Sequence, residues 1–242
     1  MRDYNIELKN RIQFIRDCLN QASASGIVYG NSGGKDSALT GILCKMACDN
    51  TVGLVMPCRS KRNYSQDKDD ALAVARQFGI EVRVIDLGSI MDEFENSIRK
   101  ITSPSSMALA NTAPRIRMTM LYAVAASENR LVAGTGNKSE GYMGYFTKWG
   151  DGAYDFNPIA DLTVTEIYEF LRFLKVTNSI LEKAPSAGLF DGQTDEKEMG
   201  ITYKVIDTYL QGDTVSEADR LIIEKFHRAS EHKRRMPLVY GG

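Results

Sequence analysis

Residues 30–37 read Gly-Asn-Ser-Gly-Gly-Lys-Asp-Ser, directly after the apolar run Ile-Val-Tyr at 27–29 and directly before a helical stretch that starts at residue 38. A strand that ends in a tight glycine turn and leads into a helix leaves the first N–H groups of that helix without partners inside it. These groups and the positive end of the helix attract anions. The order of strand, loop and helix therefore favours a phosphate-binding loop over a Gly/Ser-rich turn with no ligand.

The side chains of this loop fit the same interpretation. The hydroxyls of Ser32 and Ser37 can donate hydrogen bonds, and Lys35 adds a positive charge. Asp36 would repel a polyphosphate unless a cation lay between them, so we expect Asp36 to bind Mg²⁺. The spacing matches neither a Walker A loop nor a Gly-x-Gly-x-x-Gly dinucleotide loop.

Strands and helices alternate outward from the loop. Strands are expected at 26–30, 51–56, 81–85 and 131–134, and helices at 4–22, 36–48, 67–79, 112–129 and 163–175, with a helix and loop at about 89–110 and C-terminal helices at about 195–211 and 215–230. This alternation predicts an α/β fold, a doubly wound, mostly parallel sheet flanked by helices. Ligands of such sheets bind at the carboxyl ends of the strands, where a second glycine-rich loop, 134–141, is also expected. The aperiodic stretch 136–161 is expected to be a functional loop.

The composition fits one domain that spans residues 1–242. The chain has a formal net charge of −1, so no overall field attracts nucleic acid or an anionic membrane. No apolar run approaches the ~18 residues of a membrane span, and the N-terminus has no signal-peptide core, so a cytoplasmic protein is expected. Cys44 and Cys48 stand four residues apart, but the other two cysteines lack a matching spacing, which favours buried or idle thiols over a metal site.

Further motifs carry a resemblance to a known family. They read Asn-Thr-Ala-Pro-Arg-Ile-Arg-Met (111–118), Gly-Thr-Gly-Asn-Lys-Ser-Glu (134–140), Thr-Lys-Trp-Gly-Asp-Gly-Ala-Tyr-Asp (147–155), Pro-Ser-Ala-Gly-Leu (185–189), Gly-Gln-Thr-Asp-Glu (192–196) and His-Lys-Arg (232–234). The Ser-Gly-Gly-x-Asp-Ser loop resembles the pyrophosphate loop of the ATP pyrophosphatases. In this order and spacing, the motifs resemble the signatures of the NAD⁺ synthetases over nearly the whole chain.

The resemblance implies a fold of the adenine nucleotide alpha hydrolase type and a ligase reaction. The carboxylate of nicotinic acid adenine dinucleotide (deamido-NAD) would attack ATP, give an acyl-adenylate and pyrophosphate, and then react with ammonia to form NAD⁺ and AMP. Mg²⁺ is the implied cofactor, and a homodimer is implied. The helix at 112–129 is apolar on more than one face and is expected at the two-fold interface. The sequence encodes no glutaminase domain, so we expect free ammonia or ammonia from a separate subunit.

The resemblance also implies roles for single residues. ATP would contact Gly30, Asn31, Ser32, Gly33, Gly34, Lys35, Asp36, Ser37, Thr135 and Ser186. Deamido-NAD would contact Arg115, Lys148, Asp155, His232 and Lys233. Asp36 and Glu140 would bind Mg²⁺ and, with Lys35, would form the catalytic set. The alternative for the charged residues outside the phosphate loop is a solvated surface side chain, and Arg117 is expected to be structural or interfacial.

One position departs from the family pattern. The family has a lysine that reaches the ATP phosphates in the pattern Asp-Leu-x-Lys, where this chain has Val164. Lys35 stands where many relatives have an uncharged Gln or Val. The resemblance therefore suggests that the cation has moved from one loop to the other. The alternative is a solvated Lys35 and a Val164 that only packs on its helix.

Two other functions are weaker alternatives. Other pyrophosphate-loop enzymes, such as those that thiolate tRNA or form a deazapurine nitrile, usually need a catalytic cysteine, a Cys-x-x-Cys zinc site or a basic tRNA-binding face. None of these features is evident in the sequence. A non-catalytic nucleotide-binding module would be expected to lose Asp36 or Glu140, and both are present.

Overall fold

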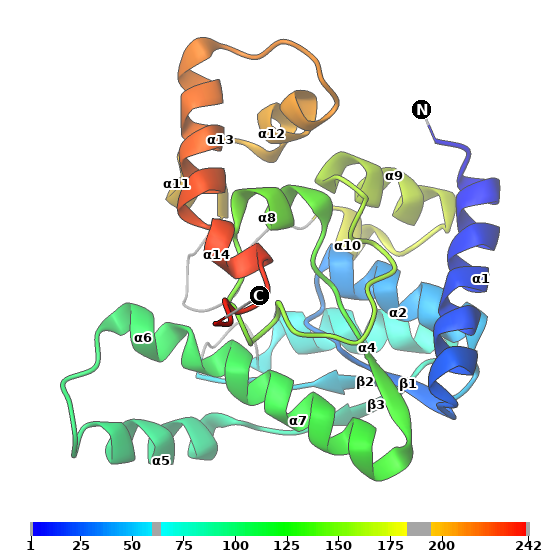
Figure 1. Ribbon diagram of the computed structural model, residues 1–242. Coiled ribbons are helices and arrows are strands. Elements are labelled where there is room, and N and C mark those ends of the chain that lie inside the picture. Colours follow the sequence, from blue (N-terminus) through cyan, green and yellow to red (C-terminus); the bar gives the residue numbers. More distant parts are fainter. Residues whose placement is uncertain (1, 60–63, 183–194, 241–242) are drawn as a thin grey trace.

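Four parallel strands form the centre of the computed structural model, which describes residues 2–59, 64–182 and 195–240 (Figure 1). The strands are β1 (Gly26–Gly30), β2 (Thr51–Val55), β3 (Glu81–Val84) and β4 (Arg130–Ala133), in the order β3-β2-β1-β4. The chain moves from β1 outward to β3 and then crosses to the other side of β1 to form β4. The strand order thus reverses between β1 and β4, and ligands of open parallel sheets bind at the carboxyl ends of the strands at such a point.

Alternate side chains of β1 point to opposite faces of the sheet, and both faces are covered by helices (Figure 1). Ile27 and Tyr29 pack with α1 (Tyr4–Ala22), α2 (Lys35–Ala47) and α4 (Gln66–Phe78). Val28 packs on the other face with α5 (Gly88–Ile98) and α7 (Thr112–Glu128). The expected doubly wound, parallel α/β fold is confirmed.

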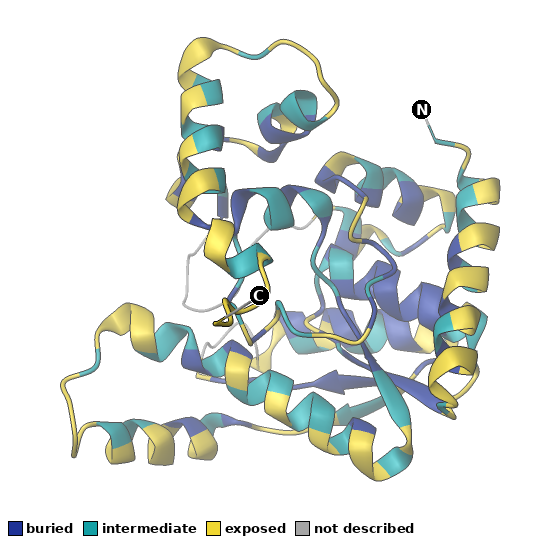
Figure 2. Ribbon diagram, viewed as in Figure 1, coloured by how far each residue is buried: buried dark blue, intermediate teal, exposed yellow. Residues whose placement is uncertain are grey.

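Helix α2 is buried along most of its length, because it lies between the sheet and the outer helices α1 and α9 (Val164–Phe173) (Figure 2). It has no room for a larger residue at Gly41, where an added Cβ would lie 2.2 Å from the hydroxyl oxygen of Tyr29. This close approach packs the middle of α2 directly against β1.

The C-terminal third forms a layer of helices above the carboxyl ends of the strands (Figure 1). With α8 (Lys138–Met143), which precedes it in sequence, this layer contains α9, α10 (Asn178–Leu181), α11 (Asp195–Met199), α12 (Tyr203–Leu210), α13 (Glu217–Ala229) and α14 (Glu231–Arg234). The short helix α6 (Ser106–Ala110) lies elsewhere, directly before α7 (Figure 1). No helix within the described ranges is long and apolar enough to cross a membrane.

The structure corrects two expectations about this layer. The single helix expected at 195–211 is interrupted, because Gly200 has a φ of +69° and separates α11 from α12. The stretch 136–161, expected to lack regular structure, contains α8. This short helix is held by a capping box between Asn137 and Glu140, which is a local hydrogen-bond pattern rather than a hydrophobic period.

Candidate active site

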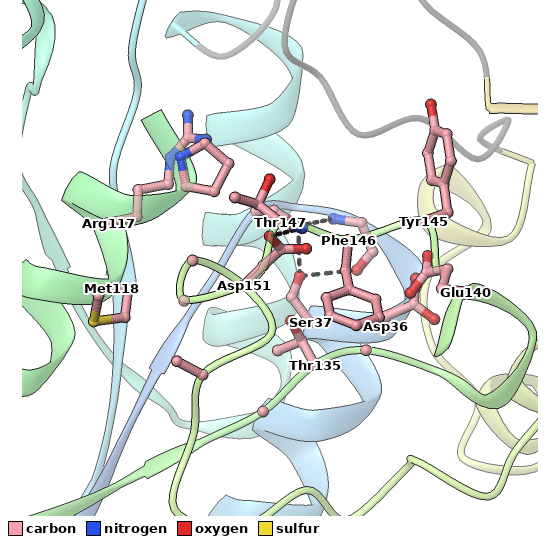
Figure 3. A pocket seen from close by; sticks show the side chains of 18 of the residues that line it. Asp36, Ser37, Arg117, Met118, Thr135, Glu140, Tyr145, Phe146, Thr147 and Asp151 are labelled. Atoms are coloured by element: carbon pink, nitrogen blue, oxygen red, sulfur yellow. Dashed lines mark hydrogen bonds between the residues drawn. The ribbon is translucent and has the colours of Figure 1, made fainter. Parts of the chain in front are cut away.

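A cavity of about 590 Å³ opens at the carboxyl ends of β1 and β4. Both glycine-rich loops contribute to its wall, where Asp36 and Glu140 lie close together (Figure 3). Residues of the C-terminal helices α9, α11, α13 and α14 line the other side. Residues from the first loop that line the cavity are Gly30, Asn31, Ser32, Gly34, Lys35, Asp36 and Ser37, and those from the second are Gly134, Thr135, Gly136 and Glu140. The topology thus brings together two segments about a hundred residues apart.

The first loop leaves the N-terminus of α2 open to an anion. Gly34 is the N-cap residue, and a glycine has no side chain with which to cap the first turn. The hydroxyls of Ser32 and Ser37 lie 3.1 Å apart, and the Ser32 oxygen accepts the N–H of Gly34 at 3.3 Å. Gly33 has a φ of +70° and meets the backbone of Asp67, so only glycine fits there.

Asp36 lies at the start of α2 with both carboxylate oxygens engaged. Oδ2 accepts a hydrogen bond from Nζ of Lys35 at 2.7 Å, and Oδ1 accepts one from Nδ2 of Asn137 at 3.0 Å. The Lys35 side chain is 5% exposed. Burial lowers the pKa of Lys35, but the charges of Asp36 and Glu140 outweigh this effect, and the net shift is upward. Lys35 is therefore a buried cation of the site and not a solvated loop charge.

Glu140 faces Asp36 from the other loop (Figure 3). Its Oε2 accepts the N–H of Asn137 at 3.2 Å, so Asn137 contacts both carboxylates. Burial, followed by the negative charge of Asp36, raises the pKa of Glu140 to about 8. Two carboxylates held close together with this little solvent repel each other, and a positive charge between them would be stabilised.

The pair of Asp36 and Glu140 fits a hard divalent cation. Mg²⁺ is bound in proteins through one or two carboxylates, with phosphate oxygens and water as its other ligands. Within the described ranges, no three His, Cys, Asp or Glu side chains form a complete metal-binding cluster. Asp36 and Glu140 could therefore hold such an ion in combination with a phosphate ligand, and not as a site made by protein alone.

Tyr203 and Asp195 extend this polar cluster, although neither was among the site residues predicted from the sequence. The Tyr203 hydroxyl donates to Oδ2 of Asp195 at 3.0 Å, and both side chains are buried. The Tyr203 ring lies 5.7 Å below Nζ of Lys35. Asp195 belongs to the Gly-Gln-Thr-Asp-Glu motif, which was the available signal, whereas nothing local marks Tyr203. Its place beside Lys35 depends on how α12 packs.

A buried carboxylate behind the cavity fixes the helix that carries Glu140. Asp207 of α12 accepts hydrogen bonds from the Ser139 hydroxyl at 2.5 Å and from the backbone and hydroxyl of Thr165, each at 2.7 Å. It thereby joins α8 to the first turn of α9. Ser139 also accepts the N–H of Val164 at 3.3 Å. Val164 itself is buried in an apolar cluster that includes Met143 and Tyr203.

Among the residues predicted to contact the dinucleotide, Lys233 lines the cavity. Its Nζ donates to the carbonyls of Gly144 and Phe146, each at 2.8 Å, and burial lowers its pKa. The other four predicted residues lie outside the cavity lining. Arg115 is exposed and donates to the carbonyl of Lys148, whose Nζ in turn donates to the carbonyl of His232 at 2.5 Å. These contacts tie the loop after α8 to α7 and to the C-terminal segment.

Asp155 has structural partners in this conformation. Oδ2 accepts the N–H of Val132 at 2.7 Å, and Oδ1 accepts the Tyr122 hydroxyl at 3.2 Å. These bonds extend the edge of the sheet next to β4. Ser186, predicted to contact ATP, lies outside the described residues, as do the motif at 185–189 and the start of the motif at 192–196.

Arg117, expected to be structural or interfacial, lines the cavity, whereas Arg115 faces solvent from the same helix. Its Nε donates to the carbonyl of Met56 at 3.1 Å, and burial lowers its pKa. Arg117 lies at the opposite end of the cavity from Asp36 and Glu140 (Figure 3). One end of the cavity therefore holds Asp36, Glu140 and the buried Lys35, and the other holds Arg117, with Asp151 close enough to act on its charge.

Comparison with known proteins agrees with this arrangement. The NAD synthase family matches residues 7–237. An NH(3)-dependent NAD(+) synthetase from Carboxydothermus hydrogenoformans is 44% identical over 231 residues, which is 94% of each chain. The structure of an NMN synthetase from Francisella tularensis superposes with a TM-score of 0.94, at 37% identity and 100% coverage of both chains. The NH3-dependent NAD synthetase of Campylobacter jejuni gives a TM-score of 0.82, at 30% identity, over 99% of this chain and 100% of that one.

Proposed function

The chain belongs to the NAD synthase family of ligases, and we propose that it amidates deamido-NAD to NAD⁺ with ammonia and ATP. The observation that carries this proposal is the meeting of two loops in one cavity. One is an open helix N-terminus suited to phosphates, and the other brings Glu140 to Asp36. The family match covers almost the whole described chain, which also supports a single catalytic domain.

The proposed reaction proceeds through an acyl-adenylate, with release of pyrophosphate and then AMP. The ATP phosphates would lie on the N–H groups at the start of α2, with the hydroxyls of Ser32 and Ser37 as further donors and Thr135 on the facing loop. Asp36 and Glu140 would hold Mg²⁺. When bound, this ion would neutralise the charge that develops on the departing pyrophosphate. The walls formed by the two loops and the C-terminal helices would reduce the access of water to the reactive mixed anhydride.

The nicotinate substrate would occupy the part of the cavity that is farther from Asp36 and Glu140. We propose that Lys233 and Arg117 bind its anionic groups, since both are cations of the cavity wall. Arg115, Lys148, Asp155 and His232 lie outside the lining, so their contact with the dinucleotide stays a prediction. The role of Ser186 toward ATP and the cytoplasmic location also stay predictions.

Product analysis tests the proposal. Purified protein with deamido-NAD, ATP, Mg²⁺ and ammonium should yield NAD⁺, AMP and pyrophosphate in equal amounts, measured by chromatography and mass spectrometry. Formation of ADP and phosphate would contradict attack at the α-phosphate. Glutamine in place of ammonium should support little turnover, and equal rates with both nitrogen sources would contradict the use of free ammonia.

A second candidate substrate is the mononucleotide. The superposition on an NMN synthetase over both full chains favours it, because a protein of that name would form NMN. The same assay with nicotinic acid mononucleotide decides between them. A kcat/KM higher for the mononucleotide than for deamido-NAD would assign the chain to NMN synthesis, with the same ATP chemistry.

A further inference from the structure

Lys35 is bonded to the carboxylate that the proposed function assigns to a metal ion. The side chain is 5% exposed, and Nζ lies 2.7 Å from Oδ2 of Asp36. Asn137 engages the other oxygen of Asp36 at 3.0 Å. In the free protein each carboxylate oxygen of Asp36 therefore has one donor, and the negative charge of Asp36 is balanced by Lys35.

Binding of a divalent cation at Asp36 and Glu140 in the absence of a nucleotide would cost free energy. The cation would either displace the ammonium of Lys35 from Oδ2 of Asp36 or lie beside this positive charge. In both cases the ammonium would stay in an enclosed position, over the ring of Tyr203 and close to Glu140, whose carboxylate would be engaged by the same ion. A buried charge that loses its partner is strongly destabilising.

A nucleotide changes this balance. Its phosphate oxygens would lie on the first turn of α2, which begins at Lys35. An ion that arrives with the phosphates gives Asp36 a new partner and at the same time gives Lys35 an anion. The single pair of Lys35 and Asp36 is then replaced by two pairs, and no buried charge is left unmatched.

We propose that Lys35 is an internal counterion that excludes divalent cations from Asp36 and Glu140 until a nucleotide binds. The metal then enters only together with the nucleotide. This inference rests on the proposed function, because it takes Asp36 and Glu140 as the metal ligands. Lys35 is the residue that makes metal binding depend on the nucleotide.

Binding of Mn²⁺ alone tests the proposal, since free Mn²⁺ is measured directly by electron paramagnetic resonance. Wild-type protein without nucleotide should bind Mn²⁺ weakly, and a non-hydrolysable ATP analogue should strengthen binding to the protein by at least ~10-fold, after the Mn²⁺ that the analogue binds without protein is subtracted. Lys35→Gln and Lys35→Met should each bind Mn²⁺ without nucleotide roughly 10-fold or more tightly than the wild type. This is the scale of one charge-assisted hydrogen bond.

Two controls locate the effect. Lys68→Gln removes another lysine from the cavity lining and should leave Mn²⁺ binding unchanged. The double variant Lys35→Gln, Asp36→Asn should lose the Mn²⁺ binding gained by Lys35→Gln alone. Thermal melting of each variant shows whether it is folded.

Three results would overturn the inference. They are wild-type binding of Mn²⁺ that is as tight without the analogue as with it, Lys35 variants that bind no better than the wild type, and an equal gain from Lys68→Gln. The first measurement needs no variant, so it stands even if the Lys35 variants do not fold. Amide formation by the same wild-type preparation separates the two claims. Active protein with any of these results removes only the counterion role, whereas inactive protein contradicts the proposed function.

Discussion

Asp36 and Glu140 lie at the same end of the cavity but have different electrostatic surroundings. Asp36 is neutralised by Lys35, whereas Glu140 is partly buried next to the negative charge of Asp36, and its pKa is raised to about 8. Removing the charge of Glu140 should therefore cost function and not stability. The proposed metal ion would need the negative charge, whereas the capping box of α8 needs only an oxygen that accepts the N–H of Asn137.

Glu140→Gln should lower kcat at least ~10²-fold, the scale for loss of one group that stabilises charge in the transition state. The melting temperature should be unchanged or slightly higher, because the amide removes a repulsion with Asp36. Glu198→Gln makes the same change at an exposed carboxylate of the same cavity and should alter kcat by less than about threefold. A Glu140 variant with wild-type kcat at limiting Mg²⁺ would remove this residue from the site.

The cation at position 35 also bears on the missing family lysine. Val164 is buried in the cluster that contains Tyr203, and Lys35 lies over the ring of that tyrosine. Val164 and Lys35 thus lie next to the same side chain, Tyr203. A lysine at either position could then place its charge in the same region, as the proposed exchange between the two loops requires. The contact of either position with a phosphate stays a prediction.

A double-mutant cycle measures whether one charge serves for both positions. Lys35→Gln should raise KM for ATP at least ~10-fold, and Val164→Lys in that background should recover part of the loss. The coupling between neighbouring sites of one network is typically 0.5–3 kcal/mol, which corresponds to a roughly 2- to 150-fold departure from additivity. Additive effects of the two substitutions on KM for ATP would show that the charge has not moved.

At the scale of elements, Asp207 connects three helices. It lies on α12, accepts from Ser139 of α8 and caps the first turn of α9 through Thr165. Its side chain is 2% exposed, so a truncated variant leaves donors unsatisfied where water does not reach them.

Asp207→Ala should lower the free energy of unfolding by about 3 kcal/mol, as expected when one partner of a buried, charged hydrogen-bond network is removed. Urea denaturation followed by circular dichroism measures this change. Asp213→Ala, at an exposed position shortly after α12, should change it by no more than about 0.5 kcal/mol. Equal stability of the two variants would show that Asp207 does not hold these helices together.

The sequence predicted some elements and not others for identifiable reasons. The strands and α1, α2, α4 and α7 were predictable, because each repeats apolar residues at the period of its structure over a sufficient length. Helix α8 has six residues and includes Gly141, so its period cannot be read, and its capping box is the only local signal. The break at Gly200 was missed because an isolated glycine is tolerated within many helices.

The site was predictable where chemistry is concentrated in short motifs. The phosphate loop and Glu140 were singled out, and the topology brings them to one cavity. Arg117 was missed as a cavity residue and Tyr203 as a neighbour of Lys35, because only tertiary packing decides which face of α7 meets the cavity and which side chain of α12 meets Lys35. Asp207 carries no motif at all. Its importance comes from partners about 40 and 70 residues away in sequence.

At the scale of the whole molecule, one surface is more apolar than an isolated domain needs. The face formed by α5, α6 and the segment between them exposes Ile90, Phe94, Ile101 and Met107, at 38%, 41%, 80% and 68%. The outer sides of α5 and α6 are exposed, and α7 runs beside them (Figure 2). Large exposed apolar patches mark interaction sites. We propose that this face, which continues along α7, is the two-fold interface of a homodimer.

Light scattering should therefore give about twice the mass of one chain. Phe94→Glu combined with Ile101→Glu should give a folded monomer, because each dimer would then bury four new charges without partners. Leu221→Glu is the matched control, since Leu221 is 50% exposed on α13, on the opposite side of the molecule in Figure 1. Met107 also lines the cavity, so loss of the dimer should raise KM for the dinucleotide more than it lowers kcat. A wild-type protein that is monomeric and fully active would contradict both the interface and its link to the site.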